Sequence, residues 1–115
     1  MTDTQDTINT TAGLLPEAVR EAVAAGKTVL KLTGDDDEAY YFEKPGQPDM
    51  NRFLATSGKG KLAQAVKNLV FDKAIHPGPD ELQRQFRDKP GRIVALNNAL
   101  QTEIGLNEDY AVKKL

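Results

Sequence analysis

The sequence has no cysteine, and it has only one histidine and one serine. Without cysteine, disulfide bonds, zinc–thiolate sites and thiol catalysis are excluded, and a reducing compartment is compatible with the chain. Its longest apolar runs fall far short of the roughly 20 residues that a membrane helix needs. The N-terminus also lacks the basic start and apolar run of a secretory signal. We therefore expect a cytoplasmic protein with no membrane partner.

The composition is that of an ordinary small domain. The chain has 115 residues, of which 28% are charged and 39% hydrophobic, and its formal net charge is -2. With that charge, no basic field attracts nucleic acid over the whole surface. Residues 1–13 are polar and threonine-rich, and they bury too little to offset the entropy of ordering. The sequence therefore predicts a flexible tail at 1–13 and a single α+β domain at 14–115.

The longest amphipathic stretch runs from Gly60 to Ala74. Its large apolar residues recur at i, i+4, i+7 and i+8, which places them on one side of a helix. This stretch predicts the central core helix, with Val66 fully buried at the middle of its stripe. The stripe consists of Leu62, Val66, Leu69 and Val70, widened by Ala63, Ala65 and Ala74.

A short helix and a β-hairpin are expected before the central helix. Pro16 suits a first helical position and Gly26 a helix end, so residues Pro16–Ala25 are predicted to be helical. Two stretches with β-branched and aromatic residues, Thr28–Thr33 and Ala39–Glu43, flank an acidic turn and predict the hairpin. Leu30 and Leu32 would share one face, and Tyr40 and Phe42 another. We expect these two pairs to meet over the central helix.

Three Pro-Gly pairs mark short connections between helices, because each precedes a helical pattern. Gly105 followed by Leu106 is typical of a helix end. The last nine residues are consistent with either a docked strand or a loose end. The predicted fold is α+β, with an N-terminal helix and a β-hairpin followed by a pack of about four short helices. Besides the central helix, these are Pro48–Thr56, Pro79–Asp88 and Arg92–Ile104, the last with a stripe of Ile93, Leu96, Leu100 and Ile104.

No stretch predicts a catalytic, cofactor-binding or metal-binding site. Asp35-Asp36-Asp37 lacks the spacing, central glycine and distal glutamate of a calcium loop, which favours a hairpin turn. His76, expected at the end of the central helix, has no orienting carboxylate or nucleophile, and Ser57 lies in no nucleophile elbow. Gly58-Lys59-Gly60-Lys61 is followed by Leu62 rather than by the Ser or Thr of a phosphate-binding loop. We therefore expect no enzyme and no cofactor.

A cluster of basic residues lies across the last two predicted helices and could contact phosphates. Acidic neighbours dilute it, so a solvated face is the favoured interpretation. A small regulatory or nucleic-acid-binding module using this cluster remains the alternative function. The cluster consists of Arg84, Arg87, Lys89 and Arg92.

Three apolar residues follow the last helix end, where the core does not obviously need them. We predict that Tyr110, Val112 and Leu115 bind a protein partner, with a simple packed terminus as the alternative. The short helix Pro16–Ala25 could pack against its own domain or against a second subunit. The sequence leaves open the oligomeric state and the surface that binds.

The stretch Tyr41-Phe42-Glu43-Lys44-Pro45, the helix that begins at Pro48 and the helix pack ending in Gly105-Leu106 resemble small phage and prophage tail assembly chaperones. The resemblance covers Thr28 to Leu115 and rests on the order and punctuation of the elements. It implies a cytoplasmic, non-enzymatic protein that binds the tape measure protein and keeps it soluble during tail assembly. The family offers no motif from which functional residues can be carried over.

Overall fold

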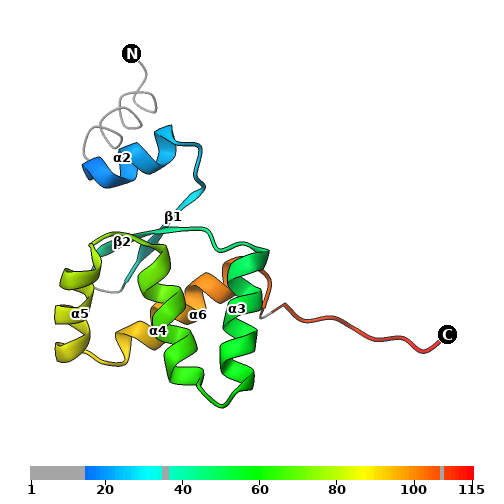
Figure 1. Cartoon of the computed structure of the whole chain (residues 1–115). Helices are drawn as coiled ribbons and strands as arrows, with labels where there is room; N and C mark the ends of the chain where they lie inside the picture. Colours follow the sequence, from blue (N-terminus) through cyan, green and yellow to red (C-terminus); the bar gives the residue numbers. More distant parts are fainter. Residues whose placement is uncertain (1–14, 35–36, 107) are drawn as a thin grey trace.

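In the computed structural model, which describes residues 15–34, 37–106 and 108–115, five helices pack around a three-stranded antiparallel sheet (Figure 1). This architecture confirms the predicted α+β fold, with a helix and a hairpin before a pack of four helices. The flexible tail predicted at 1–13 lies outside the described residues. The elements, in chain order, are α2 (Glu17–Ala24), β1 (Val29–Thr33), β2 (Ala39–Glu43), α3 (Gln47–Gly58), α4 (Leu62–Lys73), β3 (Ala74–His76), α5 (Pro79–Asp88) and α6 (Arg92–Glu103).

The hairpin brings its two apolar pairs together against the central helix, as the sequence predicts. Leu30 lies opposite Phe42 and Leu32 opposite Tyr40, so the four side chains share one face of the sheet. Tyr40 and Phe42 are buried, and the two leucines pack against the same core. The hairpin therefore supplies the apolar sheet face against which the C-terminal helices pack.

The main core lies between that sheet face and helices α4, α5 and α6. Its buried members come from β2 and from all three helices, and Phe71 and Phe86 meet edge to face at its side, with ring centroids 5.7 Å apart. Figure 1 shows α2 above the sheet and these helices below it, and α2 contacts β1 and β3. The sheet is therefore covered on both faces. The buried core residues are Tyr40, Phe42, Val66, Val70, Leu82, Leu96 and Leu100.

The end of the central helix differs from the prediction. Helix α4 ends at Lys73, and the next three residues form β3, where His76 lies opposite Tyr41 on β2. His76 is therefore a strand residue, and it is not at a helix end. Because it precedes Pro77, the helical region of its backbone is disfavoured, and the free edge of β2 offers hydrogen bonds instead.

Several apolar residues assigned to helix stripes are exposed. Leu62 is 57% exposed because it begins α4 at the end farthest from the sheet, whereas Val70 is fully buried and Val66 is 9% exposed. Leu54 on α3 and Val23 on α2 are also exposed. These residues satisfy the helical spacing, but the described neighbouring elements leave them uncovered.

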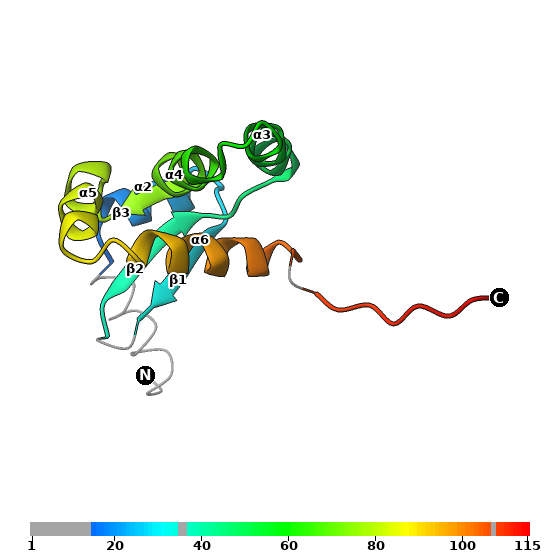
Figure 2. The same cartoon turned by 90° about the horizontal axis from the view of Figure 1, so that it is seen from below.

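The last helix ends as predicted, and the chain then leaves the domain. Gly105 has a φ of 91°, and the N–H of Leu106 donates to the carbonyl of Gln101 at 3.0 Å. That pair of features is a glycine-based helix end. Residues 108–115 then run away from the helices as an extended, exposed segment (Figures 1 and 2).

Candidate protein-binding surfaces

The helical hairpin of α3 and α4 carries an open hollow of about 650 Å³. The two helices lie side by side in both views (Figures 1 and 2). Apolar side chains of Phe53 and Leu69 form part of its wall, with Ala55 and Ala65 as small residues that leave room. A hollow of this composition suits side chains from a partner helix.

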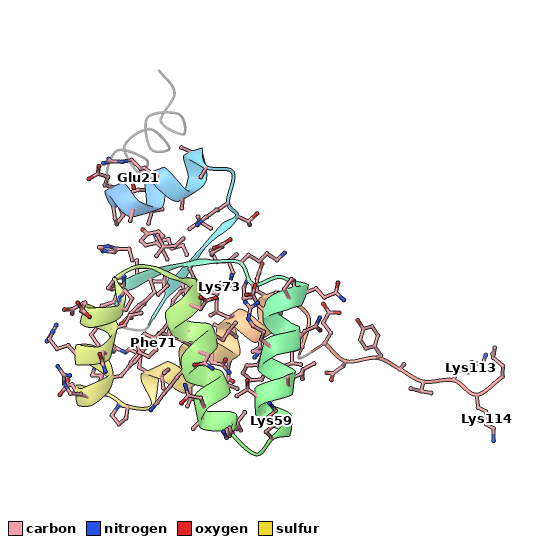
Figure 3. The ribbon with its side chains drawn as sticks, in the orientation of Figure 1. Glu21, Lys59, Phe71, Lys73, Lys113 and Lys114 are labelled. Atoms are coloured by element: carbon pink, nitrogen blue, oxygen red, sulfur yellow. The ribbon has the colours of Figure 1, made fainter. Side chains whose placement is uncertain are left out.

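Charged residues from three elements converge at the sheet end of this hollow. Asp49, which is 8% exposed, lies 3.1 Å from the Nζ of Lys73, and Arg52 pairs with the same carboxylate. Figure 3 shows Lys73 at the sheet end of α4 and Lys59 at the opposite end of the helix pair. Glu43 on β2 lies 4.0 Å from Lys73, which ties the sheet to both helices.

Asp49 also caps its own helix. Its Oδ2 accepts the backbone N–H of Gly46 at 2.8 Å, which satisfies a donor at the start of α3. Burial alone would raise the pKa of Asp49. The Gly46 hydrogen bond and the Lys73 ammonium outweigh it and hold the pKa below its usual value. The carboxylate is therefore ionised at neutral pH and anchors the ion pairs.

The predicted partner-binding residues are all solvent-exposed. Tyr110 is 79% and Val112 94% exposed, and Leu115 is fully exposed. The Tyr110 hydroxyl donates to Glu108 at 2.7 Å, and this hydrogen bond raises the pKa of Tyr110. The structure therefore places the three residues on one extended segment, where their side chains lie off the core.

The basic cluster predicted near the last two helices is partly engaged in ion pairs. Arg84 pairs with Glu81 on its own helix α5, and Arg92 donates to Glu38 at 2.9 Å. Arg92 also donates to the Tyr40 hydroxyl at 2.7 Å, and its guanidinium lies 5.9 Å from the Tyr40 ring centroid. Two of the four cations are thus held by carboxylates within the fold.

Tyr40 is the centre of this second polar cluster, which joins β2, α5 and α6. Its hydroxyl lies 2.8 Å from Glu38 and 2.7 Å from the Gln85 side-chain oxygen, both of which can accept its proton. Burial, followed by the hydrogen bond to Glu38, raises the pKa of Tyr40 to about 12. The sequence predicts Tyr40 only as a core residue, because a buried tyrosine and an apolar residue give the same alternation pattern.

Helix α6 buries two amide side chains that sequence analysis missed. Asn97 is 6% and Gln101 1% exposed. Among the described residues, the Oδ1 of Asn97 and both amide atoms of Gln101 have no hydrogen-bond partner. Each buried polar group without a partner lowers the free energy of unfolding by about 1–3 kcal/mol. Their i, i+4 spacing beside Ile93 is the signal that could have placed them on the buried face.

Ser57 and His76, which were weighed as catalytic residues, lie far apart. Ser57 lies near Lys59, at the end of the helix pair opposite Lys73 (Figure 3), whereas His76 follows Lys73 in β3. The His76 ring lies 6.4 Å from that of Tyr41. In the described part of the chain, no group of three potential metal ligands occurs and no helix is long and apolar enough to cross a membrane. Asp35 and Asp36 lie outside the described residues.

Comparison with known proteins places the chain in a family. Residues 23–113 match the model of a domain of unknown function, DUF6848. The chain belongs to this family. The DUF6848 match runs from α2 through α6 into the extended C-terminal segment, so it includes Tyr110 and Val112.

One solved structure with the same fold is an uncharacterised protein, rbstp2171, from Bacillus stearothermophilus. It is 22% identical to this DUF6848 protein and gives a TM-score of 0.69. The similarity covers 83% of this chain and 99% of that chain. At this identity the likeness concerns the fold alone. No curated protein matches the sequence.

Proposed function

We propose that this protein is a non-enzymatic phage or prophage tail assembly chaperone that binds a helical segment of the tape measure protein. The observation that carries the binding role is the open hollow between α3 and α4, with its partly apolar wall. An amphipathic helix binds such a hollow by inserting side chains spaced at i, i+3 and i+4. The charged residues of the same surface pair with one another.

The ion pair of Arg52 and Asp72 offers polar contacts to a helix bound in the hollow. Arg52 and Asp72 both line the hollow, and both are mainly exposed. An exposed pair of opposite charges can exchange its partners for those of an incoming helix at little cost. The exposed segment with Tyr110, Val112 and Leu115 is the second candidate contact.

The assignment to tail assembly rests on the resemblance in the order of hairpin, proline-started helix and helix pack. That order is compatible with the α+β fold. The alternative, a nucleic-acid-binding module, would need Arg84 and Arg92 to release Glu81 and Glu38 before they contacted phosphates. The net charge of -2 also gives the whole protein no electrostatic attraction for nucleic acid.

Co-expression with the tape measure protein of the same tail operon tests the proposal. The full-length chain is expected to keep that protein soluble and to co-purify with it. Ala55→Glu places a charge in the hollow and should abolish co-purification, whereas Lys67→Glu, on an exposed part of α4 outside the hollow, should leave it unchanged. Both variants should melt close to wild type, because both positions are exposed.

A second variant examines the C-terminal segment. Removal of residues 108–115 should weaken co-purification if the segment contacts the partner. The chaperone proposal is wrong if the full-length chain never retains the tape measure protein yet binds DNA with a steep salt dependence.

A further inference from the structure

Within the described residues, strand β1 lies at an edge of the sheet, and no further strand pairs with its outer side. The sheet order is β1-β2-β3. The carbonyl of Thr28 accepts the N–H of Lys44 at 2.9 Å, and the N–H of Gly34 donates to Glu38 at 3.1 Å. Because hydrogen-bonded pairs alternate along an antiparallel ladder, the even-numbered residues of β1 face β2. The backbone groups of the odd-numbered residues, Val29, Lys31 and Thr33, therefore point away from the sheet.

A hollow of about 640 Å³ lies beside this edge, between β1 and α6. Leu32 and Thr33 line it from the strand, and Ala95, Leu96 and Ala99 line it from the helix. Ala95 and Ala99 lie one turn apart and are exposed, so their small side chains leave space above the helix. A free strand edge beside a helix with small residues is the arrangement to which extended peptides add as a further strand.

The chain carries an extended segment of the right size. Residues 108–115 can span about 26 Å, which exceeds the roughly 17 Å of a five-residue strand. Along an extended chain, Tyr110 and Val112 point to one side and Leu115 to the other. Both Tyr110 and Val112 are almost entirely exposed.

We propose that residues 108–115 of one copy add to β1 of a second copy as a fourth, antiparallel strand. In this register Tyr110 lies opposite Leu32 and Val112 opposite Leu30, so both side chains enter the hollow over Ala95 and Ala99. Ala111 lies opposite Lys31 and exchanges backbone hydrogen bonds with it. Leu115 falls on the other face of the added strand. The proposal does not depend on the tape measure protein being the partner.

Charge complementarity favours a second copy over the chain's own segment. Helix α6 runs back roughly antiparallel to β1 (Figures 1 and 2), with Lys89 at the Thr33 end of the hollow and Glu103 one turn beyond Ala99. An antiparallel strand places Glu108 near Lys89 and Lys114 near Glu103, because both side chains share the face of Tyr110 and Val112. The chain's own segment starts at the Glu103 end, so it would lie parallel to β1 and bring its lysines toward Lys89. That arrangement sets like charges together at both ends.

Sedimentation of the full-length chain over a range of concentrations tests the proposal. The average mass should rise from 12.6 kDa toward at least twice that value. Removal of residues 108–115 should leave a monomer at every concentration, with an unchanged melting temperature in dilute solution. A full-length chain that stays monomeric at all concentrations, or that associates equally without these residues, overturns the proposal.

Two matched pairs of variants test the register and the direction. Val112→Ser should weaken association about tenfold, because a buried valine contributes about 1.5 kcal/mol, whereas Leu115→Ser should leave it nearly unchanged. Lys89→Glu and Glu108→Lys should each weaken association, and the two together should restore it. Equal effects at Val112 and Leu115, or a double variant weaker than either single one, would overturn the proposed pairing.

Discussion

At the scale of single residues, the Asp49 side chain connects two helices of the fold. It closes the first turn of α3 through Gly46 and holds Lys73 of α4, whose side chain is only 12% exposed. A nearly buried charge depends on its partner, because the partner offsets the loss of hydration. The sequence does not reveal this pair, because its members lie 24 positions apart and neither belongs to a recognisable motif.

Replacing Lys73 by alanine should therefore destabilise the domain. The change leaves Asp49 nearly buried with only the exposed Arg52 as a cation, and we expect the free energy of unfolding to fall by about 3 kcal/mol. Lys67→Ala on the exposed side of the same helix should change it by less than about 0.5 kcal/mol. Urea unfolding followed by circular dichroism measures both values. Similar losses in the two variants would show that the Asp49 pair contributes little.

Tyr40 gives a prediction at alkaline pH. Its pKa of about 12 in the folded protein lies above the ordinary value of 10, so the folded state holds the phenol proton more tightly than the unfolded state. This contribution to stability is complete below pH 10 and is lost as the pH rises through 12. The free energy of unfolding should then fall by up to about 1.4 kcal/mol per pH unit from Tyr40. Tyr40→Phe should remove that slope, and an unchanged slope would contradict the assignment.

At the scale of the elements, the sequence predicts what depends on local pattern. The hairpin of β1 and β2 follows from β-branched and aromatic residues around an acidic turn, and the four C-terminal helices follow from apolar spacing and from proline and glycine. Strand β3 was missed because Ala74 and Ile75 continue the helical pattern of α4. Only the free edge of β2, which the sequence does not display, selects a strand there. The two hollows were missed for the same reason, since they lie between elements that are distant in sequence.

Helical spacing also cannot tell which members of a stripe are covered, and two leucines show the difference. Leu100 on α6 is fully buried, whereas Leu62 on α4 is 57% exposed. Leu100→Ala should lower the free energy of unfolding by about 2–5 kcal/mol, because it opens a cavity in the core. Leu62→Ala removes the same atoms from a mainly exposed position and should cost less than about 1 kcal/mol. Chemical denaturation of the two variants would contradict the assigned core if their losses were alike.

At the scale of the whole molecule, the chain divides into a packed domain and an exposed C-terminal segment. The domain has the sheet covered by α2 on one face and by α4, α5 and α6 on the other. The segment at 108–115 contributes large apolar side chains that the domain does not bury. Exposed apolar side chains of this kind can mark contact sites, and both contacts proposed for the segment rest on this property.

The two ends of the chain should therefore respond differently to change. Removal of residues 108–115 should leave the free energy of unfolding of the dilute protein within about 0.5 kcal/mol of wild type, because no core contact is lost. Val19→Ala in α2 should lower it by about 1–3 kcal/mol, because Val19 is 2% exposed and holds α2 to the sheet. Thermal melts at a low protein concentration provide the comparison, since self-association would otherwise stabilise the longer chain. If truncation of the C-terminal segment cost as much as Val19→Ala, the segment would belong to the folded domain. Its apolar side chains would then not be free to contact the tape measure protein or β1 of a second copy.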